Sequence, residues 1–237
     1  MPAPSLDDLK RAAAAAACAR IASGTVVGLG TGSTVHPLLE LLGARLASGE
    51  LRDVVGVPTS EDTAARCRAL GIPLVSLDDH HTLALAIDGA DEVGPGLALI
   101  KGLGGALLRE KVVARAARRF VVIADVSKRV RRLGTRAPVP VEVVPFGWTT
   151  QLSFLERLGA RPVLRRDARG EPFLTDGGHY IVDCRFPRGI ADARGLARAL
   201  DGQSGIVEHG LFLGLAHEAY VAGVKGVTRL TRRSSRG

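Results

Sequence analysis

Long apolar runs and a secretory leader are both missing from this 237-residue sequence. No apolar run is long enough to cross a membrane, and Asp7 and Asp8 precede the first alanines where a signal peptide would have a basic start and an apolar core. Hydrophobic residues still make up 46% of the chain, which argues against intrinsic disorder. We therefore expect a folded cytoplasmic protein of one or two domains, without a membrane partner.

Cysteine and histidine are too few and too scattered to suggest a disulfide or a metal site. Cys18, Cys67 and Cys184 are odd in number and form no Cys-x-x-Cys pair, so we expect three small buried apolar side chains. The six histidines include the neighbours His80 and His81, but none has the spacing of metal ligands. The sequence therefore predicts no metal site.

Aromatic residues are also scarce, at 4%, although the net charge is +8. Nucleic-acid-binding proteins gather their basic residues on one face, whereas here these residues are spread along the chain. The basic run from Lys128 to Arg132 and the tail at 231–237 are expected to be solvated surface and a frayed end. We expect no nucleic-acid partner, and the positive charge instead suits a small anionic substrate.

Strand-like and helix-like segments alternate along most of the chain. Ser5 to Asp8 forms a capping box before an alanine-rich stretch, which predicts a helix to about Ser23. Such alternation is typical of an α/β fold with a doubly wound, mostly parallel sheet of Rossmann-like layout. Further strands are expected at 25–29, 53–57, 73–76, 83–87, 97–100, 120–124 and 226–230, and further helices at 35–47, 61–70 and 105–118.

The pattern changes after Lys128, where prolines interrupt the next strand-like run. Helices expected at 148–158 and 192–200, with strands at 161–166 and 179–186, predict a small α+β domain of ferredoxin-like type before the chain returns at 205–213. We therefore expect a catalytic α/β domain at 1–134 plus 205–237. The small domain at 135–204 could form an oligomer interface.

Three carboxylates and a lysine follow one apolar run in the middle of the chain. The run ends in Asp88, and Asp91 lies three residues later. Lys101 then opens a glycine-rich turn before the helical segment that carries Glu110. Carboxylates at the carboxyl end of a strand in an open α/β sheet lie where ligands usually bind, and a lysine between them can stabilise an oxyanion. The alternative is an ordinary turn rich in Asp and Gly.

A second glycine-rich turn, Gly30 to Thr34, joins a short strand to a helix. The helix dipole, the backbone N–H groups and the hydroxyls of Thr31, Ser33 and Thr34 make this turn a candidate anion site. Its glycines are spaced as GxGxG, not as the GxGxxG of a dinucleotide site, and the lysine of a P-loop is absent. The turn therefore does not match either nucleotide-binding motif, but it could still bind the phosphate group of another ligand. The alternative is a tight turn with a serine N-cap.

Six motifs occur in a fixed order over essentially the whole chain. They are Gly28-Leu-Gly-Thr-Gly-Ser-Thr34, Val57-Pro-Thr-Ser60, Asp88-Gly-Ala-Asp-Glu92, Lys101-Gly-Leu-Gly-Gly-Ala-Leu-Leu-Arg-Glu-Lys111, Ala124-Asp-Val-Ser-Lys128 and Pro140-Val-Glu-Val-Val-Pro145. Together they resemble ribose-5-phosphate isomerase of the A type. Leu103 stands where many relatives have a third consecutive glycine, a position at which other side chains are also found.

The resemblance implies interconversion of D-ribose 5-phosphate and D-ribulose 5-phosphate through an enediolate, in the non-oxidative pentose phosphate pathway, without a metal or an organic cofactor. It implies that Glu110 is the catalytic base and that Asp88, Asp91 and Lys101 line the sugar. It also implies a homodimer or a homotetramer. The substrate and phosphate positions of the family correspond to Thr31, Gly32, Ser33, Thr34, Lys128 and Lys10.

Two other functions fit part of the pattern. Related α/β domains in transcription regulators bind sugar phosphates without catalysis, but such a sensor needs a DNA-binding segment, and the sequence shows no helix-turn-helix extension. Acyl-CoA transferases share a similar fold and also use a glutamate. They are normally longer, and the lysines placed for a small phosphate argue against them.

Overall fold

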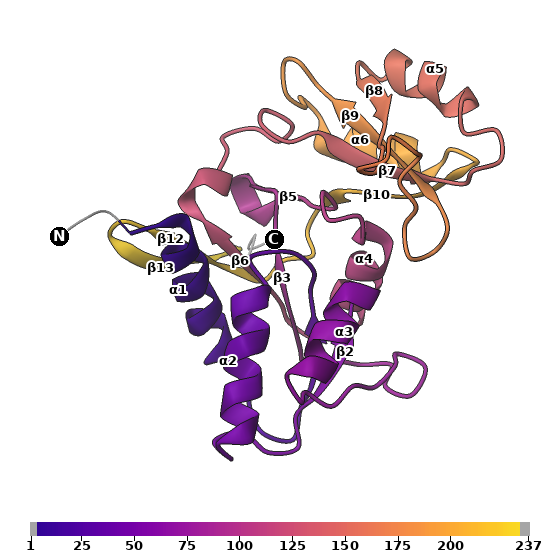
Figure 1. Ribbon diagram of the computed structural model, residues 1–237. Helices are drawn as coiled ribbons and strands as arrows, with labels where there is room; N and C mark the ends of the chain where they lie inside the picture. The colour runs from indigo at the N-terminus through magenta and orange to yellow at the C-terminus, as the bar shows by residue number, and fades with distance from the viewer. Residues whose placement is uncertain (1–3, 233–237) are drawn as a thin grey trace. The chain divides into compact units, whose positions relative to one another are not determined.

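The computed structural model describes residues 4–232, which fold into two units (Figure 1). The first unit contains residues 4–90, 109–129 and 214–232, and the second contains residues 91–108 and 130–213. Residues 1–3 and 233–237, which include most of the basic tail, lie outside the described part. Within residues 4–232, none of the helices is long and apolar enough to cross a membrane.

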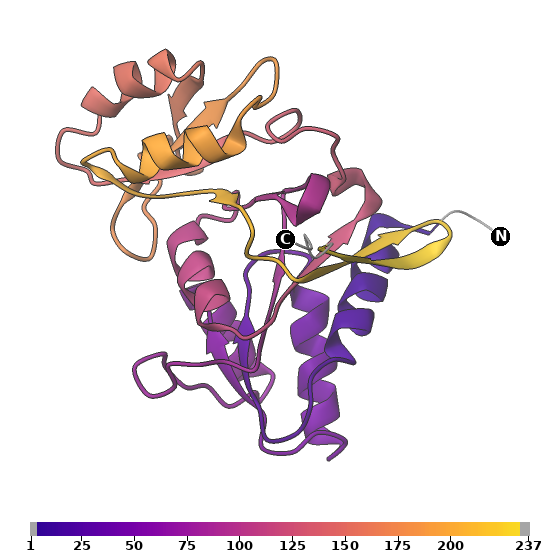
Figure 2. The same cartoon turned by 180° about the vertical axis from the view of Figure 1, so that it is seen from behind.

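A six-stranded sheet forms the centre of the first unit. Its strands lie in the order β13-β12-β6-β3-β1-β2, and every neighbouring pair is parallel except the hairpin of β12 and β13, the yellow ribbon in Figure 2. The strands are β1 (Val26–Leu29), β2 (Val55–Pro58), β3 (Leu85–Gly89), β6 (Phe120–Asp125), β12 (Glu218–Gly223) and β13 (Gly226–Thr231).

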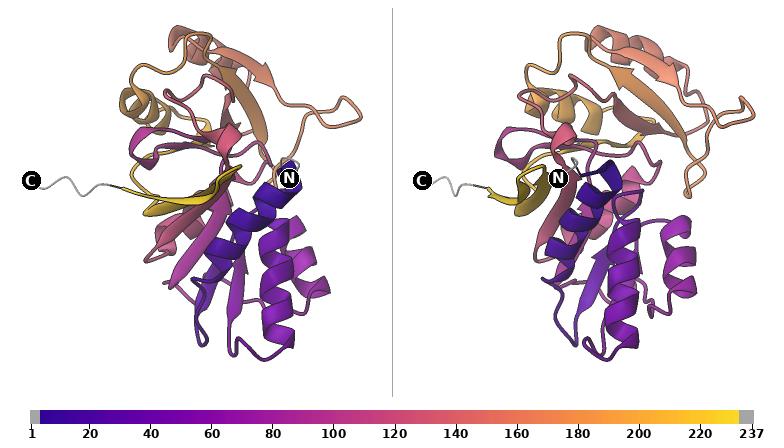
Figure 3. Two further views of the ribbon diagram at one scale, coloured as in Figure 1. Left: turned by 90° about the vertical axis from the view of Figure 1, so that its left-hand side faces the viewer. Right: turned by 60° about the vertical axis from the view of Figure 1, so that its left-hand side comes forward.

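Helices α1 (Leu6–Cys18) and α2 (His36–Ala47) lie side by side and share one core with the sheet (Figure 3). The predicted capping box is confirmed, because the side chains of Ser5 and Asp8 each accept the other's backbone N–H. The alanine-rich face of α1 is fully buried, which allows close packing. Val27 and Leu29 of β1 point into this core.

The intervening residue of β1, Gly28, points to the opposite face of the sheet. A Cβ at Gly28 would lie 2.4 Å from a methyl carbon of Val113 in α4 (Leu107–Ala116), so the glycine lets this helix pack directly on the strands. Helices therefore cover both faces, which confirms the predicted doubly wound sheet. The remaining helix of the unit, α3 (Glu61–Ala69), follows β2 and begins at Ser60, whose hydroxyl caps it.

The second unit contains an antiparallel sheet in the order β10-β7-β9-β8. Alternate residues of β7 and β9 share a core with the two helices of this unit, which gives the α+β domain expected from the sequence. A smaller sheet has the order β11-β5-β4. The elements are β4 (Glu92–Val93), β5 (Leu99–Ile100), β7 (Val139–Val143), α5 (Thr150–Arg157), β8 (Arg161–Leu164), β9 (Tyr180–Arg185), α6 (Ala193–Asp201), β10 (Ile206–His209) and β11 (Leu211–Phe212), with short 3-10 turns at Pro95–Leu97 in this unit and Val126–Lys128 in the first.

Two local predictions differ from the structure, and one strand was not predicted. The first helix ends at Cys18 and not near Ser23, because the chain turns there with 3-10-type bonds from Arg20 and Ile21. Residues 73–76 contribute only one isolated bridge, between Leu74 and Gly56. The sequence did not indicate β12, the strand next to β6. The domain division at 135 and 204 stays a prediction, and the two units differ from it by grouping residues 91–108, 130–134 and 205–213 with the second unit.

Candidate active site

Asp88 lies near the carboxyl end of β3 and is only 2% exposed. Its Oδ1 atom accepts the backbone N–H of Gly89 at 2.7 Å and that of Thr31 at 3.2 Å. A Cβ at Gly30 would lie 2.1 Å from the same oxygen, so only glycine lets the carboxylate approach the turn after β1 so closely. The two predicted glycine- and acid-rich stretches therefore meet at this point.

Four hydroxyl groups hold the turn after β1 in place. Oγ1 of Thr31 lies 2.7 Å from Oγ1 of Thr59 and donates to Oγ of Ser60 at 2.8 Å. Oγ1 of Thr63 in turn donates to the carbonyl of Gly30 at 2.8 Å. Thr59, Ser60 and Thr63 are buried, so these bonds form where water does not compete. Thr31, which was predicted to contact substrate, therefore lies at the centre of this hydroxyl network.

The other predicted residues of the turn are more open to solvent. Ser33 is exposed, Thr34 is half-buried, and Gly32 has a φ of 104°, which favours glycine. Helix α2 begins after Val35 without a side-chain cap, so the alternative of a serine N-cap at this turn is wrong. The hydroxyls of Ser33 and Thr34 are therefore not used to start the helix.

Glu110 lies in the first turn of α4 and is 4% exposed. It lines the same small, closely packed pocket as Asp88, together with Gly28, Gly30 and Thr59. The preceding residue, Arg109, donates to the carboxylate of Glu61 at 2.8 Å, which ties α4 to the start of α3. The structure thus brings two of the three predicted carboxylates to one pocket of the first unit.

Two predicted cations also belong to the first unit. Lys10 lies on α1, is mostly buried, and has its Nζ atom 3.5 Å from a carboxylate oxygen of Asp7. Lys128 is half-buried and ends the 3-10 turn that follows β6. The side chain of Asp125 accepts the N–H of Ser127 at 2.8 Å, which fixes this turn. Both lysines are therefore attached to ordered elements.

Lys101 and Asp91 belong to the second unit. Lys101 is 2% exposed, its backbone N–H donates to the carbonyl of Gly210 at 2.9 Å, and its Nζ lies 5.5 Å from the ring centre of Phe212. Asp91 is half-buried, and its Oδ2 accepts the backbone N–H of Leu103 at 3.0 Å. Asp91 therefore holds the glycine-rich loop that Lys101 opens.

Glu92, the last residue of the motif that begins at Asp88, is a further buried acid. It is fully buried, and its two carboxylate oxygens accept the backbone N–H groups of Gly134, Arg136 and Ala137 at 2.6–2.8 Å. These bonds use the carboxylate to hold the segment that leads into β7. Glu92 is thus a structural residue beside Asp91, and its place next to that residue was the only signal in the sequence.

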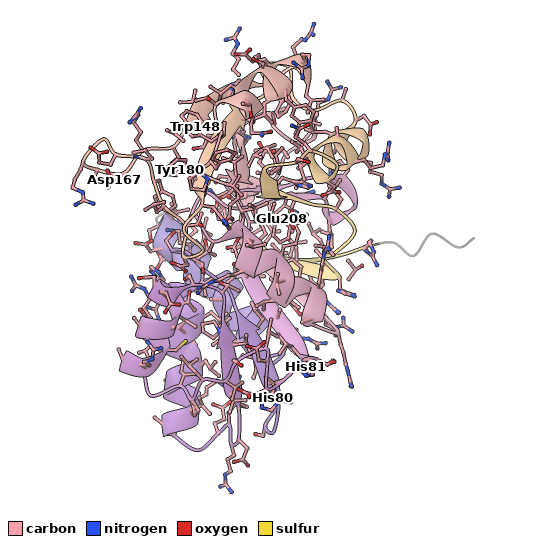
Figure 4. All side chains as sticks on the ribbon, turned by 90° about the vertical axis from the view of Figure 1, so that its right-hand side faces the viewer. His80, His81, Trp148, Asp167, Tyr180 and Glu208 are labelled. Atoms are coloured by element: carbon pink, nitrogen blue, oxygen red, sulfur yellow. The ribbon has the colours of Figure 1, made fainter. Side chains whose placement is uncertain are left out.

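The three cysteines and the neighbouring histidines His80 and His81 are not among these residues. Cys18, Cys67 and Cys184 are buried free thiols, as predicted. His80 and His81 are exposed on the connection before β3 (Figure 4). Within residues 4–232, one group with possible metal-ligand geometry is Asp201, Glu208 and His209, where Nε2 of His209 lies 3.1 Å from Asp201 and Nδ1 accepts the N–H of Leu211. Both ring nitrogens of His209 are thus already used.

A doubly wound sheet, with a buried aspartate near the end of a parallel strand and a buried glutamate in the same pocket, is typical of α/β enzymes that act on small polar substrates. Residues 55–226 match the family model of ribose 5-phosphate isomerase A, also called phosphoriboisomerase A. The chain belongs to this family of isomerases.

The relatives of the chain are similar over nearly their whole length. It is 57% identical to ribose-5-phosphate isomerase A of Roseiflexus castenholzii, with 93% of this chain and 94% of the relative covered. It is 55% identical to that of Synechococcus sp., with 95% and 98% covered. A solved D-ribose-5-phosphate isomerase in complex with phospho-erythronic acid superposes with a TM-score of 0.94, at 38% identity over 97% of this chain and all of that one. The solved ribose 5-phosphate isomerase A of Methanocaldococcus jannaschii superposes with a TM-score of 0.91. It is 39% identical over 96% of this chain and all of the solved chain.

Proposed function

We propose that the chain interconverts D-ribose 5-phosphate and D-ribulose 5-phosphate through an enediolate, with Glu110 as the general base, within the non-oxidative pentose phosphate pathway. Membership of the isomerase family supports the reaction. The observation that carries the mechanism is the burial of Glu110 beside Asp88 in one pocket. A related isomerase was solved with phospho-erythronic acid, a phosphorylated sugar acid whose carboxylate resembles the planar, charged end of an enediolate.

Glu110 would move the proton. Aldose–ketose isomerisation transfers a proton between two neighbouring carbons, so one carboxylate on the correct face can remove it and return it. Glu110 is buried in the first turn of α4, and this burial limits the positions that its carboxylate can take. A restrained base suits a transfer between carbons that lie one bond apart.

Lys101 would stabilise the oxyanion that develops when the proton leaves. Removal of a proton beside a carbonyl is unfavourable unless the new negative charge meets a fixed positive charge or hydrogen-bond donors. The side chain of Lys101 is buried with its Nζ over the ring of Phe212, and its backbone is bonded to Gly210, which together restrain the ammonium group before substrate arrives. Preorganisation of this kind contributes on the order of 3 kcal/mol per donor to the transition state.

The two aspartates would handle the sugar hydroxyls. Asp88 is the better candidate for helping to open the furanose ring, because one of its oxygens is fixed by two backbone N–H groups and the side chain is therefore held in one orientation. Asp91 would hold hydroxyl groups of the open chain. Its bond to Leu103 couples that task to the glycine-rich loop.

The phosphate would be held by Lys128, Lys10 and the turn from Thr31 to Thr34. Ser33 and Thr34 are the most accessible hydroxyl donors of this turn, because Thr31 is bonded to other hydroxyls. The phosphate takes no part in the chemistry, but its binding energy fixes the sugar in place. Loss of these residues should therefore affect both affinity and rate.

The test compares wild type, Glu110→Gln and Glu156→Gln for isomerisation of ribose 5-phosphate in excess chelator. Glu156 is an exposed glutamate on α5 and provides the matched control. Loss of a general base costs about 10²- to 10⁴-fold in rate, so Glu110→Gln should lose nearly all turnover while the control retains it. Unchanged turnover in Glu110→Gln would exclude this residue as the base. A wild type that binds ribose 5-phosphate without converting it would favour a sensor.

A further inference from the structure

A long hairpin connects β8 to β9 in the second unit, and Asp167 lies near its tip (Figure 4). Its base is fixed by Glu142 of β7, which is 1% exposed. One oxygen of Glu142 accepts the hydroxyl of Thr175 at 2.9 Å and lies 3.0 Å from Nδ1 of His179. A buried carboxylate therefore anchors the returning side of the hairpin to the sheet. The first residue of the hairpin, Arg165, is fixed separately, because its backbone N–H donates to the carbonyl of Ile181 at 2.8 Å.

The guanidinium of Arg165 joins the sheet to the glycine-rich loop. Its Nε and Nη2 atoms donate to both oxygens of Asp183 on β9, at 2.9 and 2.6 Å. Its Nη1 atom donates to the carbonyls of Gly102 and Leu103, at 3.0 and 3.1 Å. The side chain is only 12% exposed. A planar fork with several donors can make both sets of bonds at once, which a lysine cannot.

Phe173, on the other strand of the hairpin, contacts the same loop. A Cβ at Gly105 would lie 2.5 Å from a carbon of the Phe173 ring, so the ring packs directly on the backbone. Gly105 has a φ of 85°, which also favours glycine. The guanidinium carbon of Arg165 lies 5.7 Å from the ring centre of Phe173. The two side chains therefore form one support beneath the loop.

The bonds from Arg165 determine which way the loop peptides face. In a trans peptide the carbonyl and the following N–H point in opposite directions. Because Arg165 holds the carbonyl of Gly102, the N–H of Leu103 points away from it, and this N–H is the one that Asp91 accepts. Likewise, the carbonyl of Leu103 directs the N–H of Gly104 away from Arg165. Lys101 immediately precedes these peptides, and α4 with Glu110 follows them.

We propose that Arg165, supported by Asp183 and Phe173, is a positioning residue for isomerisation that fixes the loop carrying Lys101 and the partner of Asp91. This inference rests on the proposed function. Arg165 bonds to Asp183 and to the carbonyls of the loop, so it acts on the geometry of the loop. The loop without Arg165 keeps its sequence and its lysine but gains alternative backbone conformations.

The test compares Arg165→Met and Arg165→Lys with the matched control Arg166→Met. Arg166 is the neighbouring arginine, and its guanidinium donates to Gly170 within the hairpin. A misplacement of about 1 Å at a reacting site can cost about 10²-fold, so we expect kcat to fall about 10- to 100-fold in Arg165→Met, with KM for ribose 5-phosphate within about threefold of wild type. Arg165→Lys should recover part of kcat, and Arg166→Met should match wild type.

Hydrogen–deuterium exchange of the peptide covering 101–106 gives a readout that does not depend on activity. We expect about tenfold faster exchange in Arg165→Met than in wild type, and no change in Arg166→Met. The proposal is overturned if exchange is unchanged, or if kcat of both Arg165 variants stays within about twofold of the control. Inactivity of the wild type would instead contradict the proposed function, and it would be seen before any variant is compared.

Discussion

The carboxylate of Asp88 lies where a side chain on Gly30 would have to be, because a Cβ at residue 30 would lie 2.1 Å from Oδ1. Gly30→Ala must therefore displace Asp88 or the turn that carries Thr31. Overpacking at a buried site costs about 1–3 kcal/mol in the free energy of unfolding, and displacement of Asp88 should reduce kcat by about 10²-fold. Thermal unfolding and isomerase assays on the purified variant measure both effects.

Gly223→Ala is the control for this substitution. Gly223 ends β12 in the same unit, and a Cβ there would meet its nearest neighbour, Val126, at an ordinary distance of 3.6 Å. This variant should keep both stability and activity. If Gly30→Ala behaved like Gly223→Ala, the close approach between Asp88 and the turn would have no functional importance.

Glu92→Gln should destabilise the protein. The substitution replaces one acceptor oxygen by an NH₂ group, which would then face a backbone N–H of Gly134, Arg136 or Ala137. A buried donor left without an acceptor costs about 1–3 kcal/mol, and the lost charge adds to this penalty. Urea unfolding of Glu92→Gln and of the exposed-site variant Glu156→Gln measures the difference. Equal midpoints would show that the three bonds contribute nothing to stability.

Local sequence patterns were sufficient for most of the fold. The capping box at Ser5 and the cap at Ser60 are confirmed because caps depend only on neighbouring residues. The strand β12 was not predicted because it begins with a charged residue, Glu218. A charged residue at the start of an apolar run resembles a loop, and only the pairing of β12 with β6 and β13 makes it a strand.

Some residues of the candidate site could also be predicted from local motifs, whereas others depend on contacts between distant parts of the chain. Motifs placed Asp88 and Glu110 near strand and helix ends, and the structure brings both to one pocket, while their catalytic roles stay predictions. Arg165 could not be found from the sequence, because its contacts to Gly102 and Leu103 join residues more than sixty positions apart. Nothing in the local pattern distinguishes Arg165 from its neighbour Arg166. Such long-range bonds depend on the register of β8 with β9.

The three cysteines should be unreactive in the folded protein. Burial raises the pKa of the Cys67 thiol to about 11, and burial also raises the pKa values of Cys18 and Cys184. The thiolate is the reactive form, so a disulfide reagent at pH 8 should modify almost none of the three thiols. All three should react after unfolding in guanidinium chloride. Rapid reaction of any thiol in the native state would contradict its burial.

Glu218 should make stability depend on pH in the acidic range. This residue is fully buried on β12, and its carboxylate accepts hydrogen bonds from Arg119 at 3.0 Å and from Arg229. Burial alone would raise the pKa of Glu218, but the bonds and charges of the two guanidinium groups outweigh it and hold the pKa below its ordinary value of 4.5. The unfolded chain therefore takes up this proton at a higher pH than the folded protein.

The sign of the pH effect follows from that difference. A lowered pKa in the folded state means that the stabilisation is fully present above about pH 4.5 and is lost as the pH falls through the folded pKa. Glutamine has no ionisable group at this position, so only wild type loses this stabilisation in acid. The difference between the unfolding temperatures of wild type and Glu218→Gln should therefore be widest at neutral pH and should narrow in acid. Calorimetry at several pH values, with Glu156→Gln as the control, measures this gap. A gap that stayed constant or widened on acidification would mean that the two arginines do not hold Glu218 in its ionised form.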